Sequence, residues 1–336
     1  MWRRSTRWVP LAVLGVLAAV FVSGAIGASG KTGALDGKNV GVIICTNQNP
    51  FCAAWASSVK SGLEKQGASV TVLSSVFDPA VDAQNMNRLI ADRPDLIISV
   101  PASASAIVPS YIRAKSAGIP ILGAIGRQSA AGAKIVTAEA RTDDPALGRY
   151  AAMNLVEGMK KAGYKTGNVI ALTGTASQNN VTDRMATFKA YMKKFPQYKI
   201  VSIQDTNWDQ ATSAKVAQQL LSKYGSKGGI QGAYGMADNM AIGIIQGAKQ
   251  AGVPVGVSKK NGLIVTGSNC LAVGIKSIKA GVQYGTGTQA PQVEAALAVK
   301  VAAQILNGGK PPKVSYVKES RITKANVARF TKLCTF

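Results

Sequence analysis

Short runs of apolar, largely β-branched residues alternate with helical segments along most of the chain. The first run, residues 40–44, leads into a polar turn. A helix then begins at Asn49-Pro50, where a capping side chain precedes a residue of fixed φ, and it ends at Gly67. Strands that alternate with helices over short connections are typical of right-handed βαβ units and a parallel sheet. The sequence therefore predicts an α/β fold.

The alternation forms two successive series, and a chain of 336 residues is longer than one core usually supports. After the first helix, the first series predicts strands at 70–73, 96–100 and 119–125 and helices at 79–92 and 106–117. The second predicts strands at 168–173, 199–204, 231–234 and 263–266 and helices at 144–161, 181–194, 210–224, 239–250 and 271–279. Asp78 and Asp238 are the expected caps of two of these helices. We therefore expect two similar, doubly wound parallel-sheet lobes.

The first residues have the composition of an export signal. Three arginines and an apolar run at 9–22 precede a stretch of small residues. We interpret residues 1–28 as a secretory signal peptide that is cleaved after Ala25 or Ala28, with an uncleaved membrane anchor as the alternative. The mature protein is then expected in the periplasm or another extracytoplasmic compartment.

The chain contains no histidine. This removes His-dependent catalytic triads, the usual His zinc sites and a His-based pH switch. Neither a Gly-x-Ser-x-Gly elbow nor a Walker loop occurs in the sequence. A degenerate dinucleotide pattern at 285–290 follows a predicted helix and lies near the end of the chain, which is the wrong context for that motif. We therefore expect no enzyme activity, no cofactor and no metal.

The formal net charge is +23 at pH 7. The lysines and arginines are scattered along predicted helix faces and loops, without a dense cluster or an interleaved aromatic platform. This pattern favours a solvated basic surface and argues against a nucleic-acid partner. Attraction to an anionic envelope or solute is the alternative.

Open α/β sheets bind ligands at the carboxyl ends of their strands. After the first strand, a ligand there would meet Asn49, Phe51 and Cys52. Phe51 and Trp208 are aromatic residues among polar turn residues, and aromatic rings of this kind pack against the apolar face of a sugar. A core contact at the helix start is the alternative for Phe51. Trp55, one helical turn later, is expected in the core.

Six short motifs carry a family resemblance. They are Asn49-Pro50-Phe51, Gly126-Arg127-Gln128, Asp183-Arg184-Met185, Asn207-Trp208-Asp209, Ala237-Asp238-Asn239 and Thr288-Gln289-Ala290-Pro291. Their order and spacing resemble the periplasmic sugar-binding proteins of the ribose-binding type, which are type I periplasmic binding proteins and solute receptors of ABC transporters. The resemblance runs from about residue 38 to about residue 332. It implies a small polar ligand held between two lobes.

The resemblance also implies ligand contacts. Asn49, Arg127, Arg184 and Gln289 match the family in residue type, and each lies beyond a predicted strand or at a helix start. A surface salt bridge is the alternative for either arginine. The full set of expected ligand contacts is Asn49, Phe51, Cys52, Arg127, Arg184, Trp208, Asn269 and Gln289.

Four positions depart from the family pattern. An aromatic is replaced by Cys52, an Asp by Gly126, an Asn by Ala237 and another Asp by Asn269. Because two hydroxyl-accepting carboxylates are lost, the charge of the ligand is open. A neutral sugar or polyol is our first expectation, and a sugar acid or other small anion bound by the arginines is the second. Aspartates near the same loops can also neutralise the arginines: Asp183, Asp205, Asp209 and Asp238.

By the same resemblance, the chain crosses between the lobes near Arg141, Gly287 and Glu319 and so forms a three-segment hinge. The expected lobes are 36–140 plus 288–318 and 141–287 plus 319–336. A helix at 291–306 and a strand at 313–318 belong to the first lobe, and 323–336 is expected as a helical tail on the second.

These features predict a monomeric receptor that captures a small solute and delivers it to a separate membrane permease driven by an ATPase. The alternative is a sensory receptor that presents the ligand to a membrane kinase or chemoreceptor. A transcription regulator of this fold would need a helix-turn-helix before residue 40, where the signal-like run stands.

Four cysteines in an exported chain are expected to form disulfides. Cys45 and Cys52 flank the turn after the first strand, so one bridge would make this turn rigid. Cys270 follows a strand of the second lobe and Cys334 lies in its tail, so the other bridge would hold the tail. Four cysteines allow three pairings, and free thiols are the alternative.

Overall fold

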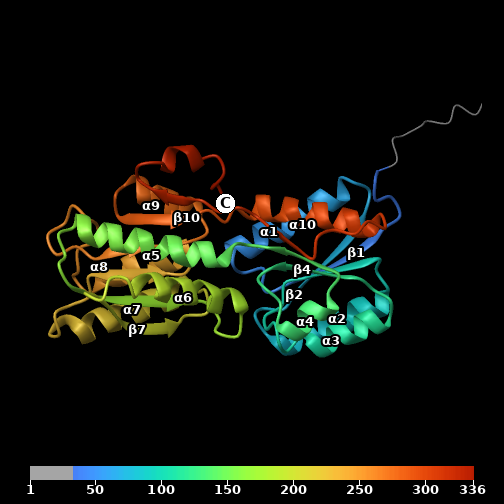
Figure 1. The fold of residues 1–336 in the computed structure, drawn as a ribbon, viewed down its shortest axis with the longest axis horizontal. Helices are drawn as coiled ribbons and strands as arrows, with labels where there is room; N and C mark the ends of the chain where they lie inside the picture. The colour runs from blue at the N-terminus through green and yellow to red at the C-terminus, as the bar shows by residue number, and fades with distance from the viewer. Residues whose placement is uncertain (1–32) are drawn as a thin grey trace, which may run out of the picture. The chain divides into compact units, whose positions relative to one another are not determined.

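We describe residues 33–336 in a computed structural model (Figure 1), and the predicted signal peptide lies outside these residues. One six-stranded sheet consists, in spatial order, of β11 (Val314–Tyr316), β5 (Ala138–Arg141), β4 (Ile121–Ile125), β3 (Leu96–Ser99), β1 (Asn39–Ile44) and β2 (Ser69–Ser74). Its neighbouring strands all pair in parallel. The helices of this first lobe are α1 (Pro50–Glu64), α2 (Pro79–Asp92), α3 (Val108–Ser116), α4 (Ala130–Ile135) and α10 (Pro291–Leu306).

The second six-stranded sheet consists of β12 (Arg321–Thr323), β10 (Gln283–Gly287), β9 (Ile264–Thr266), β8 (Gly232–Gly235), β6 (Gly167–Thr173) and β7 (Tyr198–Asp205). Only β12 runs antiparallel to its neighbour. The helices of this second lobe are α5 (Asp144–Lys161), α6 (Asn179–Met192), α7 (Gln210–Gly225), α8 (Asp238–Gln250), α9 (Ala272–Lys279) and the short 3-10 helix η1 (Val327–Phe330). The predicted α/β class with two parallel-sheet lobes is confirmed.

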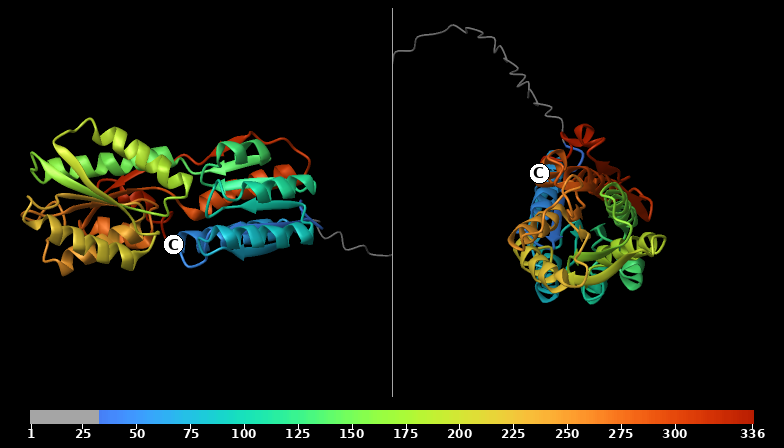
Figure 2. Two further views of the ribbon diagram at one scale, coloured as in Figure 1. Left: turned by 90° about the horizontal axis from the view of Figure 1, so that it is seen from below. Right: turned by 90° about the vertical axis from the view of Figure 1, so that its left-hand side faces the viewer.

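Helices cover both faces of each sheet (Figure 2), and β1 shows why its sequence is apolar throughout. Val42 and Ile44 lie in the core cluster formed with α1 and α10, whereas Ile43 lies in the cluster formed with α2 and α3. A strand covered on both faces has no polar side, so it appears as a continuous apolar run. Trp55 of α1 is fully buried in the first of these clusters, as predicted.

Two of the predicted helix caps are confirmed. The Asn49 Oδ1 atom accepts hydrogen bonds from the backbone N–H groups of Phe51 and Cys52, at 3.0 and 3.3 Å. Asp78 accepts from the N–H of Ala80 at 2.7 Å, and α2 has the predicted bounds. These bonds satisfy N–H groups that the helix itself leaves without partners.

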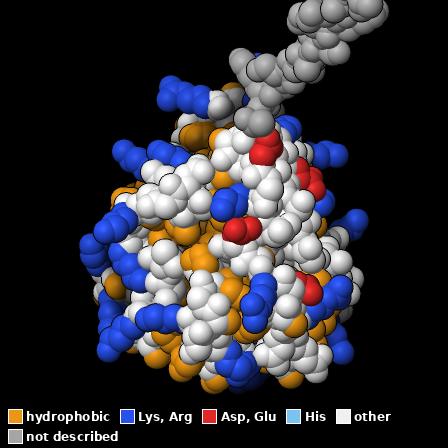
Figure 3. All heavy atoms as spheres, turned by 90° about the vertical axis from the view of Figure 1, so that its right-hand side faces the viewer, with side chains coloured by type: hydrophobic (Ala, Val, Ile, Leu, Met, Phe, Trp, Pro, Cys, Tyr) orange, Lys and Arg blue, Asp and Glu red, His pale blue; other side chains and the backbone are white. Residues whose placement is uncertain are grey.

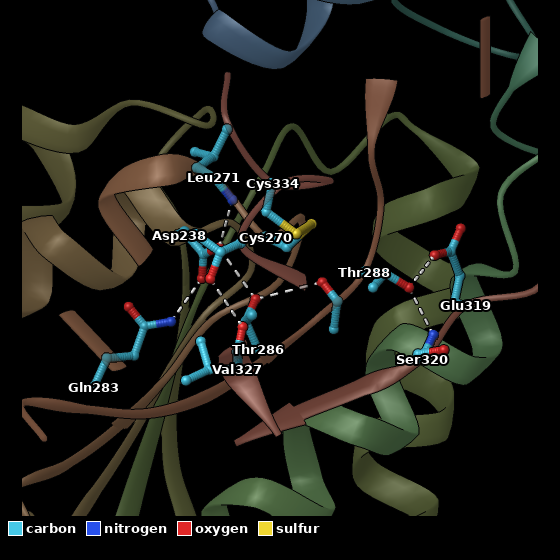
Figure 4. Close-up of a disulfide and its surroundings, with 12 residues drawn as sticks. Asp238, Cys270, Leu271, Gln283, Thr286, Thr288, Glu319, Ser320, Val327 and Cys334 are labelled. Atoms are coloured by element: carbon cyan, nitrogen blue, oxygen red, sulfur yellow. Dashed lines mark hydrogen bonds between the residues drawn. A yellow bond between two sulfur atoms is a disulfide. The ribbon is translucent and has the colours of Figure 1, made fainter. Parts of the chain in front are cut away.

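The predicted cap at Asp238 is wrong. The carboxylate of Asp238 is turned into the second lobe, where it accepts from the Leu271 N–H at 2.9 Å, from Gln283 Nε2 at 2.6 Å and from Thr286 Oγ1 at 3.1 Å (Figure 4). The N-cap of α8 is Ala237, which has no side-chain bond to offer. Asp238 therefore joins β10 to the start of α9 instead of capping its own helix.

Several elements were not predicted from the sequence. The strand β5 and the short helix α4 fell between predicted elements, and the pattern at 285–290 begins within β10. A side chain at Gly285 would place its Cβ 2.5 Å from the Ile322 carbonyl, so β10 needs glycine where β12 passes it. The tail at 323–336 belongs to the second lobe as predicted, but it is not the expected helix, because Thr323 ends β12 and only η1 is helical beyond it.

The chain passes between the two sheets at residues 142–143, 288–290 and 317–320. These segments are joined by hydrogen bonds: the Thr288 N–H donates to the Ser320 carbonyl at 2.8 Å, and Gln289 Nε2 donates to Thr142 Oγ1 at 2.9 Å. Three adjacent crossings are the arrangement that the sequence led us to expect. Their action as a hinge stays a prediction.

A disulfide between Cys270 and Cys334 fastens the tail to the second lobe (Figure 4). It lies in a small apolar cluster that also contains Ile322 and Val327. This bridge was one of the two expected from the sequence, and it is confirmed.

Candidate functional site

The described residues form a pocket from segments that follow the carboxyl ends of strands in both sheets. The first lobe contributes Cys45, Asn49, Phe51, Cys52, Phe77, Val100, Pro101, Ala104, Ala124, Ile125, Gly126, Arg127 and Gln128, and the later chain contributes Gln178, Asn179, Asn180, Arg184, Trp208, Asn269 and Gln289. The space open to the centre of a water molecule is about 60 Å³.

All eight residues that the sequence analysis selected as ligand contacts line this one pocket. They come from widely separated positions along the chain, and the two sheets bring them together because all of them follow strand ends or helix starts. The structure contains no ligand, so their contact with a ligand stays a prediction. Ala237, Asp205 and Asp209 do not belong to the lining.

Arg184 is the most constrained side chain of the pocket, with an exposed fraction of 1%. Its Nε donates to Asp144 Oδ1 at 2.7 Å. Its Nη1 donates to the Met236 carbonyl and to Asn269 Oδ1, both at 3.1 Å, and its Nη2 donates to Gln289 Oε1 at 2.8 Å. These bonds occupy four of the five N–H groups of a guanidinium. Arg184 therefore orders the amides around it, and one of its N–H groups has no partner among residues 33–336.

The charge of Arg184 is compensated inside the protein. Burial raises the pKa of Asp144 to about 6, and the nearby Arg184 charge opposes this rise. Burial likewise opposes the charge of Arg184, but the Asp144 carboxylate holds the pKa of Arg184 above its usual value. At neutral pH the two form a buried ion pair, which the hydrogen bonds of Asn269 and Gln289 complete.

Arg127 is paired in a different way. Its Nε and Nη2 atoms both donate to the carboxylate of Asp183 at 2.9 Å, a bidentate bond from the first lobe to the second. These hydrogen bonds hold the pKa of Arg127 above its usual value. The backbone carbonyl of Arg127 also accepts from Asn179 Nδ2 at 2.8 Å. Arg127 is thus both a pocket residue and a contact between the lobes.

Three aromatic side chains face the pocket. Trp208 donates from Nε1 to Gln178 Oε1 at 2.7 Å, and its ring lies beneath the Arg184 guanidinium at 5.6 Å from carbon to ring centre. Phe51 is packed edge-on against Phe336 of the tail. Phe77, which packs against the cores of both lobes, was not predicted. It follows β2 among polar residues, which is the pattern that identified Phe51 and Trp208.

Amides dominate the polar lining. In several of these amides, the oxygen or the nitrogen is bonded to the protein and the other atom has no partner among residues 33–336. The atoms without a partner are the Oδ1 of Asn179 and the amide nitrogens of Asn49, Gln128, Gln178, Asn180 and Asn269. An amide both donates and accepts, as a hydroxyl group does. Our sequence analysis missed Gln128, Gln178, Asn179 and Asn180 as lining residues. Their position after a strand end was the available signal.

Strained backbone is concentrated at the pocket. Phe77, Ile125, Trp208 and Asn269 all have positive φ, at 60°, 64°, 59° and 85°. A left-handed conformation is unfavourable for Phe, Trp and above all the β-branched Ile125, whereas Asn269 tolerates it better. Such strain collects at functional sites, where the surrounding structure holds side chains in required positions. The strain therefore supports this pocket as the functional site.

Cys45 and Cys52 are free thiols in the structure, so the second predicted disulfide is not formed there. Their Sγ atoms lie 3.1 Å apart, and both side chains are buried. Contact with Cys45 and burial raise the pKa of the Cys52 thiol. The two sulfurs lie at opposite ends of the turn that carries Asn49.

Buried carboxylates lie behind the pocket, at the three crossings. Glu294 accepts from Thr142 Oγ1 at 2.5 Å, and Glu319 accepts from Thr288 Oγ1 at 2.7 Å. Each has a second oxygen that is buried without a partner. Burial raises the pKa of Glu319 to about 8, and burial together with the charge of Glu319 raises the pKa of Glu294. The sequence predicted a crossing near Glu319 but not that its carboxylate is buried.

Within residues 33–336, no group of acidic or cysteine side chains is arranged to hold a metal ion. No helix in this part of the chain is long and apolar enough to cross a membrane.

The sequence matches the periplasmic binding protein domain over residues 40–310. This match spans most of the chain, so the protein belongs to the periplasmic binding protein family. Among its relatives is a xylitol-binding protein of Mycolicibacterium smegmatis, 24% identical over 93% of this chain and 86% of the relative. The ribose import binding protein of Haemophilus influenzae is 25% identical over 81% of this chain and 86% of that protein.

Solved structures show the same fold. A galactofuranose binding protein superposes with a TM-score of 0.81 at 20% identity, over 88% of this chain and 98% of the other. An ABC transporter solute binding protein from Mycobacterium smegmatis, solved with bound glycerol, gives 0.79 at 20% identity, over 88% and 96%. The two-lobed architecture is therefore that of known binding proteins.

Proposed function

We propose that the protein is the solute-binding receptor of an ABC importer and captures a small neutral sugar or polyol in this pocket. The observation that carries the proposal is the pairing of both pocket arginines with protein carboxylates, Arg184 with Asp144 and Arg127 with Asp183. A ligand then meets a lining rich in amides, whose two arginines are each neutralised by a carboxylate outside the lining. Relatives that bind xylitol and import ribose support the same class of ligand.

The charge balance argues against an anionic ligand. A sugar acid gains most where a buried cation has no partner, because an unpaired charge in the interior is costly. Arg184 has no such need, since Asp144 already lies at 2.7 Å. An anion bound by both arginines was the second expectation from the sequence. Such an anion would have to compete with two ion pairs that are already formed within the protein.

The size of the pocket points to a small ligand. A space of about 60 Å³ open to the centre of a water molecule is small, and it suits a monosaccharide or short polyol better than an oligosaccharide. Aromatic faces at Phe51, Phe77 and Trp208 suit the apolar side of such a ligand. The amides supply bonds to its hydroxyl groups.

We assign residues 36–141 plus 288–318 to one lobe and 142–287 plus 319–336 to the other, because Arg141 ends β5 of the first sheet, one residue beyond the boundary expected from the sequence. We expect the lobes to move about the three crossings when ligand binds. The proposed partner is a membrane permease. The receptor is exported and monomeric, and it acts on the outer side of the membrane that contains this permease. A sensory role, in which the same ligand is presented to a membrane kinase or chemoreceptor, uses the same pocket. Uptake by the reconstituted permease distinguishes the two roles. Catalysis has no place in this proposal.

A thermal-shift screen of pentoses, hexoses, pentitols and their sugar acids tests the proposal, since tight binding raises the melting temperature by mass action. We expect neutral members to raise it and the acids to fail. Calorimetric titration with a matched pair, ribose and ribonate, then compares the affinity for a neutral sugar with the affinity for its acid. Stronger binding of ribonate, lost in Arg127→Ala, would overturn the neutral assignment.

Asn179→Ala provides the site control, because Asn179 offers an amide oxygen to the pocket. Loss of a hydrogen bond to a neutral partner is expected to weaken binding by about tenfold. Gln218→Ala, an amide exposed on α7, serves as the matched variant and should bind as the wild type does. Equal affinities of the two variants would show that the ligand binds elsewhere.

A further inference from the structure

The fold gathers lysines that are scattered in the sequence. In the second lobe, β6 to β10 run parallel, so the helices α5 to α9 all end at the same edge of the sheet, the amino ends of the strands. Helix α5 ends with Lys160 and Lys161, and Lys165 follows in the loop. Lys193 and Lys194 stand directly after α6. All of these lysines are exposed.

The next helices continue the pattern. Lys223 lies in the last turn of α7, and Lys227 follows in the loop to β8. Lys249 lies in the last turn of α8, and the loop to β9 carries Lys259 and Lys260. These are exposed as well. We call this edge, from the ends of α5 to α9 and their following loops, the lysine face.

The acids of the same lobe lie elsewhere. Between residues 162 and 287 the acids are Asp183, Asp205, Asp209 and Asp238. Asp205 ends β7, Asp209 and Asp238 lie at the starts of α7 and α8, and Asp183 lies in the second turn of α6, so all four lie towards the pocket edge. Glu157 is the one acid beside the lysine face in the described chain from 157 to 287, and it is already bonded to Lys161 and Arg321. The face therefore carries a nearly unopposed positive charge.

Helix dipoles alone do not explain this segregation. Lysines near helix carboxyl ends are favoured by the dipole, and the first lobe has helices of the same orientation. Yet the corresponding edge of the first lobe holds Asp36, Glu64, Asp92 and Asp95 among its cations. On the right-hand side of the molecule, viewed in Figure 3, acidic side chains lie among more numerous basic ones. The lysine face is thus a property of the second lobe.

The chemistry of the face fits a diffuse anionic surface. Its cations are lysines, which act as hydrated point charges and lack the planar fork with which arginine reads bases or single phosphates. The nearby rings are partly buried and already covered: Lys160 lies over Phe195, and Lys194 lies over Tyr191. No exposed aromatic platform is left for stacking nucleotides on this face. Nucleic acid is therefore the poorer fit.

We propose that the lysine face is a docking surface for an anionic phospholipid membrane. Such a surface attracts clustered lysines over a distance of about one Debye length, without a specific site. Because the face is the edge of the second lobe opposite the pocket, docking leaves the pocket open to solute. It would hold the receptor close to the membrane that contains the proposed permease. This inference goes beyond solute binding and does not depend on it.

Vesicle co-sedimentation of the signal-free chain tests the proposal. Vesicles of phosphatidylcholine alone are compared with vesicles containing about one third phosphatidylglycerol, at about 20 mM and about 300 mM salt. We expect binding to the anionic vesicles at low salt and a loss of about tenfold or more at high salt. Binding to phosphatidylcholine alone, or binding insensitive to salt, would overturn the proposal.

A matched pair of variants locates the surface. Lys193→Gln/Lys194→Gln/Lys223→Gln/Lys227→Gln removes four charges from the lysine face, and Lys65→Gln/Lys115→Gln/Lys134→Gln/Lys310→Gln removes four exposed charges from the first lobe. Both have the same net charge, and thermal melting checks that both fold. We expect the first variant alone to lose about tenfold in vesicle affinity. Equal losses of vesicle affinity in the two variants would mean that binding depends on net charge and not on a docking face. Tighter binding to a DNA duplex than to vesicles at the same salt would favour nucleic acid as the partner. Either result refutes the proposal.

Discussion

At the scale of single residues, Gly126 is one of the four positions at which the sequence departs from the pattern of the sugar-binding proteins that it resembles. The atom nearest to a Cβ built there is the Asn180 Cβ, at 3.6 Å, so the backbone accepts a side chain without a clash. The glycine is therefore not required by packing. Its effect is to leave out a carboxylate next to Arg127, and this makes its role in ligand choice testable.

Gly126→Asp should tighten the binding of a neutral sugar or polyol, because a carboxylate accepts hydroxyl protons more strongly than an amide does. A charged hydrogen bond of about 1.5 kcal/mol corresponds to about tenfold in affinity. Calorimetry on the ligand found by the thermal-shift screen measures the change. Gly126→Ala is the control, since it adds the same Cβ without charge. If both variants bind alike, the missing carboxylate has no part in ligand choice.

The turn from Cys45 to Cys52 yields a second prediction at this scale. The two Sγ atoms lie 3.1 Å apart, and an exported protein meets oxidising conditions. We expect the isolated, unreduced protein to contain no alkylatable thiol, and reduction to expose all four cysteines to alkylation. Closing so short a loop should contribute about 2–3 kcal/mol to stability. Two thiols that alkylate in the unfolded but unreduced chain would instead identify Cys45 and Cys52 as a permanent dithiol.

At the scale of elements, local signals determined what the sequence could predict. The bounds of α2 followed from Asp78-Pro79, and β1 followed from its β-branched run, because both signals are local. The strand β10 could not be predicted in this way, since Gln283–Gly287 has no apolar run and exists as a strand only because β9 and β12 flank it. The lysine face was missed for a related reason: residues that are distant in sequence meet only through the parallel order of the strands.

The same distinction between local and tertiary signals applies to the site. Asn49, Arg184 and Trp208 were found because each follows a strand and lies in a family motif. The partner of Arg184 was not found, because Asp144 reaches it from another helix, forty residues earlier in the chain. Sequence therefore identified which side chains face the pocket, whereas the charge that a ligand meets there depends on tertiary pairing.

The pairing of α5 with α6 positions Arg184, and Gly148 permits it. A Cβ at residue 148 would lie 2.0 Å from the Arg184 carbonyl oxygen and 2.4 Å from Thr187 Oγ1. Gly148→Ala must push α6 away, and we expect a loss of about 2–3 kcal/mol in the free energy of unfolding together with weaker ligand binding. Chemical denaturation measures the first effect. Gly225→Ala, at an open helix end with nothing within 4 Å, is the control and should be neutral or slightly stabilising.

At the scale of the whole molecule, the buried carboxylates link stability to pH. Burial raises the pKa of Asp238 to about 7 and of Glu319 to about 8, and it also raises that of Glu294. A carboxyl whose pKa is raised by folding binds its proton more tightly in the native state. Its contribution to stability is therefore complete below the pKa of the unfolded chain, near 4, and is lost as the pH rises through the folded value.

We therefore expect the free energy of unfolding to be larger at about pH 5 than at about pH 8.5, by on the order of 2–5 kcal/mol. Denaturation with urea at both pH values measures the difference. Glu319→Gln removes one of the carboxyls with a raised pKa from the crossings, so the variant should lose part of this pH dependence while its stability at high pH approaches or exceeds that of the wild type.

Glu157→Gln is the matched control. Burial opposes the charge of Glu157, but its bonds to Lys161 and Arg321 lower its pKa to about 2, so its contribution changes only in acid. The Glu157→Gln variant should be less stable than the wild type at both pH values, and its stability should change between the two pH values by as much as that of the wild type. A Glu319→Gln protein whose stability falls as steeply as that of the wild type between these pH values would mean that Glu319 does not titrate in this range.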